Sequence, residues 1–248
     1  TGQSKGAMLT QDNLFSNSQS LCLLWEINEK DILIHALPIF HTHGLFVAVN
    51  TSLLSGATIR FIKNFNLDLI IEAIPSSTIL MGVPTFYTRL LKDNRLNSEL
   101  TKNMRLFISG SAPLMTETHI EFEKITGHQI LERYGMTETN MNSSNPYNGI
   151  RKPGTVGLPL NDIDIIITNL DTGDILNQGE VGMIEIKGPN IFKGYFNMLE
   201  KTKKEFRPNG YFITGDMGIF DEDGYLTIVG REKDLIISGG YNIYPKEI

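Results

Sequence analysis

The chain has 248 residues, of which 41% are hydrophobic and 20% are charged, a balance typical of folded globular proteins. The formal net charge is −6, and the 22 Lys and Arg residues are spread along the chain. This distribution argues against nucleic acid as the main partner, because proteins that bind nucleic acid usually carry a basic patch or stripe. No apolar run approaches the roughly 18 residues that a membrane span requires. The length suits one large domain or two smaller ones.

The only cysteine, Cys22, lies in the apolar stretch of residues 21–25. A single cysteine cannot form a disulfide within the chain, so we expect a reducing compartment such as the cytoplasm. We interpret Cys22 as a small buried residue and not as a catalytic thiol. The chain begins with Thr1 instead of Met and stops at Ile248 inside a recognisable pattern, so we expect both natural ends to lie beyond it.

Short apolar runs alternate with segments of helical spacing through the first part of the chain. The predicted strands span residues 31–37, 57–62, 78–82, 105–109 and 129–133. The predicted helices between them span residues 45–54, 67–74, 84–91 and 115–125. Pro84 suits a first helical turn, where its missing N–H costs nothing. This alternation predicts an α/β fold over residues 1–150, with a mostly parallel sheet flanked by helices.

The second part, residues 151–231, predicts a smaller β-rich subdomain. Its predicted strands span residues 163–168, 182–187, 210–214 and 225–229, and Gly-containing turn signals at residues 171–173, 208–210 and 223–224 separate them. Long helical patterns are absent here, and we expect residues 142–153 to form a loop that joins the two parts.

Residues 1–6 read Thr-Gly-Gln-Ser-Lys-Gly. A Gly-rich stretch with a lysine can wrap a phosphate, with backbone N–H groups and the ammonium facing the anion. The spacing differs from that of a Walker A loop, which needs a longer interval between its glycine and its Gly-Lys pair. A plain loop is therefore the alternative for this segment taken alone.

Residues 134–139 read Tyr-Gly-Met-Thr-Glu-Thr and follow a predicted strand. Loops at the carboxyl ends of strands in an open α/β sheet tend to form the ligand crevice. The ring of Tyr134 can stack on a flat base, the hydroxyl of Thr137 can bond a phosphate, and Glu138 can offer a hard oxygen ligand to Mg²⁺. A polar turn with Tyr134 packed in a core is the alternative.

The run at residues 134–138 resembles the signature of the AMP-forming acyl-adenylate superfamily, which comprises acyl-CoA synthetases, nonribosomal peptide adenylation domains and firefly luciferase. Four further stretches resemble motifs of that family in the same order. They are residues 1–6 (the second half of the phosphate loop, with Ser4 where Pro is usual), 109–114 (beside the adenine), 211–216 (the ribose segment), and 230–234 with 239–245 (the hinge). The five motifs in this order are specific for this superfamily, whereas each motif alone is not.

The resemblance implies ATP, Mg²⁺ and coenzyme A as reactants and cofactor. Asp216 would accept hydrogen bonds from both ribose hydroxyls, a role that suits the paired oxygens of a carboxylate. Arg231 would touch the ribose or the phosphates, Thr137 would bond the α-phosphate, and Glu138 would hold Mg²⁺. The residues implied at the nucleotide are Thr1, Gly2, Lys5, Gly6, Ser111, Ala112, Pro113, Glu132, Tyr134, Gly135, Met136, Thr137, Asp216 and Arg231.

In this family a small C-terminal lid domain follows the hinge and carries the lysine used for adenylation. Asp234 matches the hinge position, so the resemblance implies that residues 232–248 are the hinge and the start of that lid. We therefore expect the 248-residue chain to have little synthetase activity by itself.

Two features favour malonate as the acid. Malonate keeps one carboxylate after the other is activated, and Arg133, directly before Tyr134, offers a planar fork that bonds both oxygens of a carboxylate. His41 and His43 can line one side of the same pocket and donate hydrogen bonds to an anion; a Zn²⁺ site lacks a third spaced ligand. A structural or surface Arg133, and merely polar surface histidines, are the alternatives.

Residues 37–48, 81–91 and 131–142 resemble bacterial malonyl-CoA synthetases more closely than the wider superfamily, and Ser4 belongs to this narrower match. The resemblance implies that Arg133, Ser111 and one of His41 and His43 hold the distal carboxylate, and that Thr137, Glu138 and His41 form the catalytic set. The open alternatives are a synthetase for another short or aryl acid, an adenylation domain that loads a carrier protein, and a nucleotide-binding paralogue without catalysis. The sequence leaves the oligomeric state open.

Overall fold

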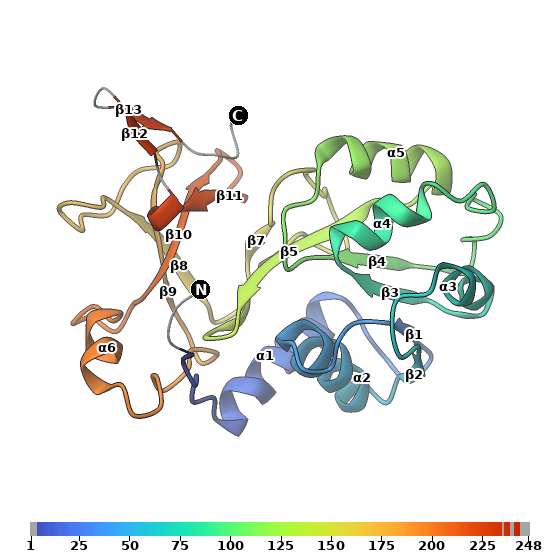
Figure 1. Ribbon diagram of the computed structural model, residues 1–248, viewed down its shortest axis with the longest axis horizontal. Coiled ribbons are helices and arrows are strands. Elements are labelled where there is room, and N and C mark those ends of the chain that lie inside the picture. The colour runs from blue at the N-terminus through green and yellow to red at the C-terminus, as the bar shows by residue number, and fades with distance from the viewer. Residues whose placement is uncertain (1–3, 235, 239–240, 244–248) are drawn as a thin grey trace.

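The computed structural model describes the backbone of residues 4–234, 236–238 and 241–243, and the side chains of residues 4–234. Figure 1 shows two lobes: an α/β lobe made by the elements from α1 to β7, and a β lobe made by β8–β11 with α6. Within these described residues, no helix is long and apolar enough to cross a lipid bilayer.

The α/β lobe is built on a seven-stranded sheet with the order β2-β1-β3-β4-β5-β6-β7. Strands β2, β1, β3, β4 and β5 are parallel to one another, whereas β6 and β7 add antiparallel strands at one edge. The predicted mostly parallel α/β sheet is therefore confirmed. The strands are β1 (Ile32–His35), β2 (Thr58–Phe61), β3 (Ile79–Gly82), β4 (Leu106–Ser109), β5 (Ile130–Met136), β6 (Asn140–Ser144) and β7 (Leu158–Pro159).

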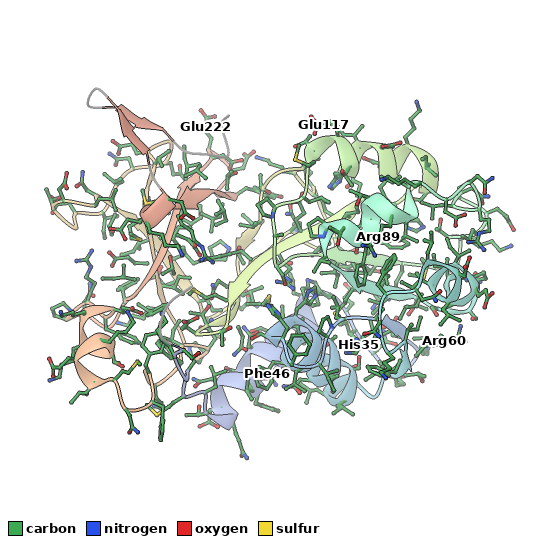
Figure 2. The ribbon with its side chains drawn as sticks, viewed as in Figure 1. His35, Phe46, Arg60, Arg89, Glu117 and Glu222 are labelled. Atoms are coloured by element: carbon green, nitrogen blue, oxygen red, sulfur yellow. The ribbon has the colours of Figure 1, made fainter. Side chains whose placement is uncertain are left out.

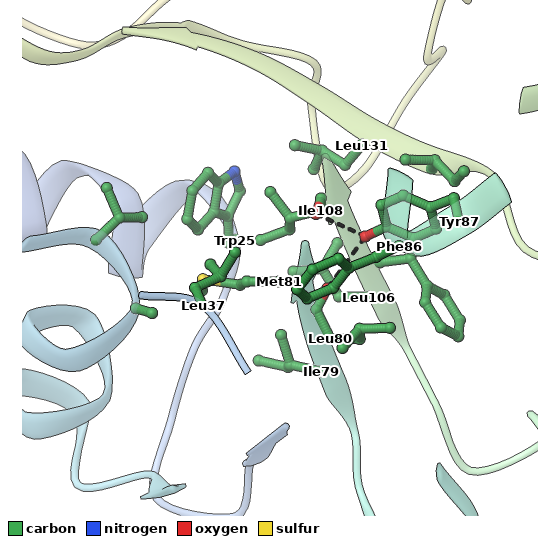
Figure 3. Packing of buried hydrophobic residues seen from close by; sticks show 14 of the residues in the cluster. Trp25, Leu37, Ile79, Leu80, Met81, Phe86, Tyr87, Leu106, Ile108 and Leu131 are labelled. Atoms are coloured by element: carbon green, nitrogen blue, oxygen red, sulfur yellow. Dashed lines mark hydrogen bonds between the residues drawn. The ribbon is translucent and has the colours of Figure 1, made fainter. Parts of the chain in front are cut away.

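Helices cover both faces of this sheet, with α4 and α5 on one side and α1 and α2 on the other (Figure 1). Tyr87 of α4 is fully buried, and its hydroxyl donates a hydrogen bond of 2.6 Å to the carbonyl of Ile108 on β4 (Figure 3). The ring of Trp25 is buried in the same core. The helical elements are α1 (Gln11–Leu24), η1 (His43–Val49), α2 (Asn50–Ser55), α3 (Leu67–Ala73), η2 (Ile74–Ser76), α4 (Pro84–Leu90) and α5 (Thr116–Thr126).

The β lobe is an antiparallel four-stranded sheet with the order β11-β10-β9-β8. The strand predicted at residues 210–214 is the start of a nine-residue strand that continues past Asp216, because β-bulges near Asp216 bend the strand without ending its pairing. Its elements are β8 (Asp164–Thr168), β9 (Gly182–Lys187), α6 (Leu199–Lys204), β10 (Phe212–Phe220) and β11 (Leu226–Arg231), followed by η3 (Glu232–Asp234), β12 (Ile236–Ser238) and β13 (Tyr241–Ile243).

Helix α1 was not predicted, and its buried face explains why. Its buried residues are Asn13, Asn17, Ser18 and Leu21, so three of the four positions that face the core are polar. Thr10 caps the helix: its hydroxyl accepts a hydrogen bond from the Asn13 N–H, and the Asn13 side chain accepts one from the Thr10 N–H. Polar contacts thus fix α1, and a hydrophobic pattern does not reveal it.

The expected loop at residues 142–153 is wrong at its start, because β6 runs through the interior there. All five residues of β6 are buried although four of them are polar. Asn17 of α1 both donates to the Met141 carbonyl and accepts from the Met141 N–H, and the indole of Trp25 donates to the Ser144 hydroxyl. These partners satisfy part of a polar strand that would otherwise be costly to bury, whereas the side-chain amide of Asn140 has no partner among the described residues.

The helix predicted at residues 45–54 forms, but its first part is the π-helix η1, which starts at His43. π-Helical turns are rare in proteins, and those that occur are often found at functional sites. Gly44 makes this turn possible, because a Cβ there would lie only 2.1 Å from the Pro38 carbonyl oxygen.

Candidate active site

A cavity of about 710 Å³ lies between the two lobes, at the carboxyl ends of the parallel strands. A second cavity of about 320 Å³ adjoins it. The two share five lining residues: Ser111, Arg133, Gly135, Met136 and Arg231. Most of the residues singled out in the sequence therefore meet in one continuous hollow.

Arg133 lies on β5 and is 3% exposed, with its guanidinium beside the large cavity. Its Nε and Nη2 atoms have no hydrogen-bond partner among the described residues. Burial lowers the pKa of Arg133 to about 9, partly offset by Tyr87. Buried unpaired charge is costly, and an anion placed here would relieve the cost.

His43 and Ser111 lie on the same side of the cavity as Arg133. The Nδ1 atom of His43 is 3.4 Å from the Ser111 hydroxyl, and its buried Nε2 has no partner among the residues that the structure describes. Burial first, and then the Arg133 charge, hold the pKa of His43 well below its usual range, so the imidazole is neutral at physiological pH. A neutral imidazole has one N–H to donate to an anion without adding charge.

His41 is exposed and lines the large cavity, and its Nδ1 accepts a hydrogen bond of 3.3 Å from the His43 N–H. Of the two histidines, His43 is thus the buried one beside Arg133, and His41 lies at the rim.

The turn after β5 carries Thr137 and Glu138 into the large cavity. The hydroxyl of Tyr195 donates a hydrogen bond of 2.8 Å to Glu138 Oε1 and accepts one of 3.1 Å from Lys5 Nζ. The Lys5 ammonium also lies 4.5 Å from the centre of the Tyr195 ring. A cation, a hydroxyl and a carboxylate are therefore gathered at one end of the cavity.

The donor set at Glu138 fits Mg²⁺ that is shared with a nucleotide. No group of three or more His, Cys, Asp and Glu side chains that could form a metal cage occurs among the described residues. Mg²⁺ commonly takes one or two protein carboxylates and completes its shell with phosphate oxygens and water. Glu138 supplies such a carboxylate, and the adjacent Thr137 and Lys5 suit phosphates.

Asp216 lies on β10 where the two lobes meet, and it is buried. Its Oδ2 accepts a hydrogen bond of 2.6 Å from the hydroxyl of Tyr134, and Arg231 Nε lies 3.3 Å from its Oδ1. Burial raises the pKa of Asp216, opposed by Tyr134 and Arg231. The same burial raises the pKa of Tyr134. The pair links β5 of the α/β lobe to the β lobe.

The small cavity is lined by Ala112, Pro113, Glu132 and Asp234, together with Tyr134 and Asp216. Glu132 accepts a hydrogen bond of 3.0 Å from the Gly154 N–H, and its Oε1 lies 3.6 Å from Nδ1 of the buried His119. This largely apolar hollow beside Tyr134 has a volume of about 320 Å³, which leaves room for a planar base.

One residue predicted at the nucleotide, Gly6, falls elsewhere. Gly6 does not line either cavity; its carbonyl accepts a hydrogen bond of 2.7 Å from the Phe196 N–H, in the segment that also holds Tyr195. Thr1 and Gly2 lie outside the described residues.

Sequence reasoning missed Tyr195, which contacts both Lys5 and Glu138. It lies 57 residues after Glu138 in the chain, and no short motif marks it. It also missed Thr214, whose hydroxyl lines the large cavity and accepts a hydrogen bond from the Asp216 N–H; only its place inside the 211–216 stretch could have revealed it.

Comparisons with known proteins identify the family of the chain. The chain matches the family described as AMP-binding enzyme over residues 1–196. A malonate–CoA ligase of Arabidopsis thaliana is 38% identical over 269 aligned residues, which span 100% of this chain and 44% of that relative. A long-chain-fatty-acid–CoA ligase of Bacillus subtilis is 37% identical, spanning 100% of this chain and 45% of that relative.

Among solved structures, ATP-bound MatB from Rhodopseudomonas palustris superimposes with a TM-score of 0.98 at 59% identity, over 100% of this chain and 49% of that chain. This chain thus spans about half the length of the proteins it matches. The family match covers most of its residues, and the nucleotide motifs meet in one cavity. The chain therefore belongs to the AMP-binding enzyme family.

Proposed function

We propose that the full-length protein activates malonate with ATP, releasing pyrophosphate, and transfers the malonyl group to coenzyme A. The observation that carries the choice of acid is the buried guanidinium of Arg133, which lines the cavity and whose Nε and Nη2 atoms have no partner among the described residues. A dicarboxylic acid keeps one carboxylate after activation, and that group would pair with the guanidinium.

The nucleotide would lie across both cavities. Its base would fit the small cavity behind Tyr134, beside Ala112, Pro113 and Glu132. Its ribose hydroxyls would bond Asp216, with Arg231 near the ribose or phosphates. The phosphates would extend toward Thr137 and Lys5 in the large cavity.

Glu138 would hold Mg²⁺ against these phosphates. The bound ion would supply electrostatic stabilisation of the charge on the phosphates. Tyr195 would orient the Glu138 carboxylate, since its hydroxyl donates to Oε1. Lys5 would add a second positive charge on the same side.

The distal carboxylate of the acid would be held by Arg133, with Ser111 and His43 as further donors. His43 is the better placed of the two histidines, because it is buried beside Arg133 while His41 is exposed at the rim. The proximal carboxylate would then face Thr137, at the α-phosphate, with His41 close to the reacting groups.

In the first step a carboxylate oxygen of the acid attacks the α-phosphorus, a new P–O bond forms, and the bond to pyrophosphate breaks with its electrons on the leaving group. In the second step the sulfur of coenzyme A attacks the acyl carbon, a C–S bond forms, the thiol proton is lost, and AMP leaves. Fixed donors aimed at the developing charge are the main contribution of the residues described above.

The hinge and the domain limits belong to the same proposal. Asp234 lies in η3, directly after β11, and would be the pivot, with residues 232–248 as the hinge and the start of the lid domain. With a single cysteine, Cys22, the chain suits a reducing compartment such as the cytoplasm.

The test is pyrophosphate release by the full-length protein, screened across mono- and dicarboxylic acids. Arg133→Met should lose roughly 100-fold or more of its kcat/KM for malonate, as expected when the partner of a buried carboxylate is removed, and gain relative activity with butyrate. Arg151→Met is the control, because Arg151 is a partly buried arginine that bonds only backbone carbonyls and lines neither cavity. An undiminished preference of Arg133→Met for malonate would contradict the proposal that Arg133 binds the distal carboxylate.

A second candidate substrate is methylmalonate, favoured by the same observation. Its distal carboxylate is identical, so Arg133 does not separate it from malonate. The acid screen decides between them by comparing kcat/KM for the two acids. Release of pyrophosphate with long-chain fatty acids alone would instead favour the chemistry of the Bacillus subtilis relative.

A further inference from the structure

His35 is a buried histidine that no motif in the sequence singles out. It ends β1 inside the α/β lobe (Figure 2), and its side chain is 0% exposed. Its Nε2 lies 3.0 Å from the carbonyl oxygen of Gly44, and its Nδ1 accepts a hydrogen bond of 3.2 Å from the Leu37 N–H. Because a backbone N–H can only donate, Nδ1 carries no proton, and the ring proton is on Nε2 and points at Gly44.

The two bonds of His35 tie together the ends of one tight loop. The loop leaves β1 at Leu37 and returns at Gly44, where the missing side chain lets the backbone approach the Pro38 carbonyl. The His41 N–H donates to that same Pro38 carbonyl at 3.3 Å, and the Leu45 N–H donates to the His41 carbonyl at 2.9 Å. The loop is therefore closed by its own backbone hydrogen bonds. Among the bonds named here, the two of His35 join the loop to a side chain of β1.

This loop carries the histidine of the acid pocket. His43 is the residue directly before Gly44 and the first residue of η1. Its ring stands 3.4 Å from the Ser111 hydroxyl, and Nε2 is buried and unpaired among the described residues. The backbone at His43 sets the direction of its unpaired Nε2. The carbonyl of the next residue, Gly44, is hydrogen-bonded to His35.

We propose that His35 is a positioning residue for the acid: through the Gly44 carbonyl it fixes the start of η1, and thereby aims His43 at the carboxylate that Arg133 binds. This inference rests on the proposed function, since it takes the space beside Arg133 and Ser111 as the acid pocket. Burial lowers the pKa of His35, which agrees with a neutral ring that can still accept from Leu37.

His128 offers a matched control in the same lobe. Its Nε2 lies 3.1 Å from the Thr101 carbonyl oxygen, as that of His35 does from Gly44, and burial likewise lowers its pKa. Its ring meets Phe107 edge-on at 5.2 Å, as the His35 ring meets Phe61 at 5.4 Å. His128 does not line either cavity. The two histidines therefore share the bond from Nε2 to a backbone carbonyl, and they differ in what that backbone supports and in burial, since His128 is partly exposed.

The experiment compares His35→Phe and His128→Phe in the full-length protein, with separate KM values for malonate and for ATP. His35→Phe should raise the malonate KM roughly tenfold, the size expected for one or two lost hydrogen bonds, while the ATP KM stays within about twofold, inside the ordinary scatter of such comparisons. His128→Phe should change neither KM. His35→Gln, whose amide N–H can still reach Gly44, should restore part of the malonate affinity.

The outcomes separate the two proposals. If Arg133→Met loses malonate but His35→Phe keeps the wild-type malonate KM, the positioning role is overturned and the proposed function stands. Equal rises of the malonate and ATP KM values in His35→Phe would also overturn it, because they indicate a general loss of structure. If Arg133→Met keeps its malonate preference, the proposed function fails first. If His35→Phe does not fold, the same KM comparison is made on His35→Gln. An unchanged ratio of malonate KM to ATP KM in His35→Gln, together with a lowered melting temperature, would count against the positioning role.

Discussion

The guanidinium of Arg133 lies against the backbone of Gly110, so closely that a Cβ at position 110 would fall 2.4 Å from its Cζ atom. Gly110 follows β4, and Arg133 lies on the neighbouring strand β5. The absence of a side chain on one strand end thus makes the space for the charged side chain on the next. Because Arg133 would hold the distal carboxylate, this contact becomes part of the acid pocket.

Gly110→Ala should therefore displace the guanidinium without removing it. We expect the malonate KM to rise by roughly 10-fold or more, since a misplaced bidentate partner forfeits about one charge-assisted hydrogen bond. The ATP KM should change little. Gly127→Ala is the control: its Cβ would meet nothing within 4 Å, although its φ of +76° strains any side chain there. It should lower stability by about 1 kcal/mol and leave both KM values unchanged, whereas an unaffected malonate KM in Gly110→Ala would contradict the packing argument.

Arg133→Met should make the unliganded protein more stable while it loses malonate. Replacing an uncompensated buried charge with an apolar side chain of similar length typically gains about 1–4 kcal/mol. Thermal unfolding without ligands measures this, and adding malonate to the ATP-bound protein should raise the melting temperature further in the wild type only. A lower melting temperature for Arg133→Met would mean that the guanidinium is already paired in the unliganded protein, which would contradict this argument.

The difference in unfolding free energy between Arg133→Met and the wild type should depend on pH with a definite sign. Burial lowers the pKa of Arg133 to about 9 from its much higher ordinary value. Between these values the unfolded chain holds a proton that the folded chain has released, so the wild type gains stability as the pH rises through this window. Below pH 9 the full cost of the buried charge is present. The advantage of Arg133→Met should therefore be constant near neutral pH and shrink above pH 9, as followed by chemical unfolding from pH 7 to pH 10.

Ser111 combines a functional hydroxyl with a strained backbone, because its φ is +69°. Ser111→Gly and Ser111→Ala both remove the hydroxyl that faces His43, so both should raise the malonate KM by a similar factor, roughly 2- to 10-fold for one hydrogen bond. Only glycine relaxes the backbone, so Ser111→Gly should be more stable than Ser111→Ala by about 1 kcal/mol. Chemical unfolding of the two variants gives the comparison, and equal stabilities would show that the strain is small.

The parallel strands could be predicted because their apolar runs are continuous. The prediction for residues 78–82 differs from β3 (Ile79–Gly82) by one residue, and that for residues 105–109 differs from β4 (Leu106–Ser109) by one residue. Both strands are buried along their full length, so every position is apolar or small. By contrast, α1 and β6 place asparagines and serines in the core, so no hydrophobic period marks these two elements.

The candidate site divides in the same way. Thr137, Glu138 and Asp216 stand in motifs, and the structure brings them to the junction of the two lobes. Tyr195 and His35 act through contacts that only the folded chain creates: Tyr195 reaches Glu138 across 57 positions, and His35 bonds a backbone carbonyl whose orientation depends on a π-helical turn. Sequence pattern reports which side chains carry chemistry, but it does not report which residues hold them in place.

Tyr195→Phe tests the support of the metal ligand directly. The hydroxyl of Tyr195 orients Glu138 and accepts from Lys5, so its loss should weaken Mg²⁺-dependent ATP binding by roughly 2- to 10-fold, the equivalent of one hydrogen bond. ATP binding in the absence of Mg²⁺ should fall less, because Lys5 still carries its charge. Calorimetric titration of ATP with and without Mg²⁺ measures both quantities without turnover.

Tyr225→Phe is the control for that titration. Tyr225 has a lysine ammonium 4.4 Å from its ring centre, as Tyr195 has at 4.5 Å, and its hydroxyl donates to the Ile150 carbonyl at 2.7 Å, but it lines neither cavity. It should leave ATP binding unchanged with and without Mg²⁺. If Tyr195→Phe weakened binding equally under both conditions, its hydroxyl would serve Lys5 and the phosphates instead of Glu138. The ratio of the two affinities therefore assigns the hydroxyl to the carboxylate or to the ammonium.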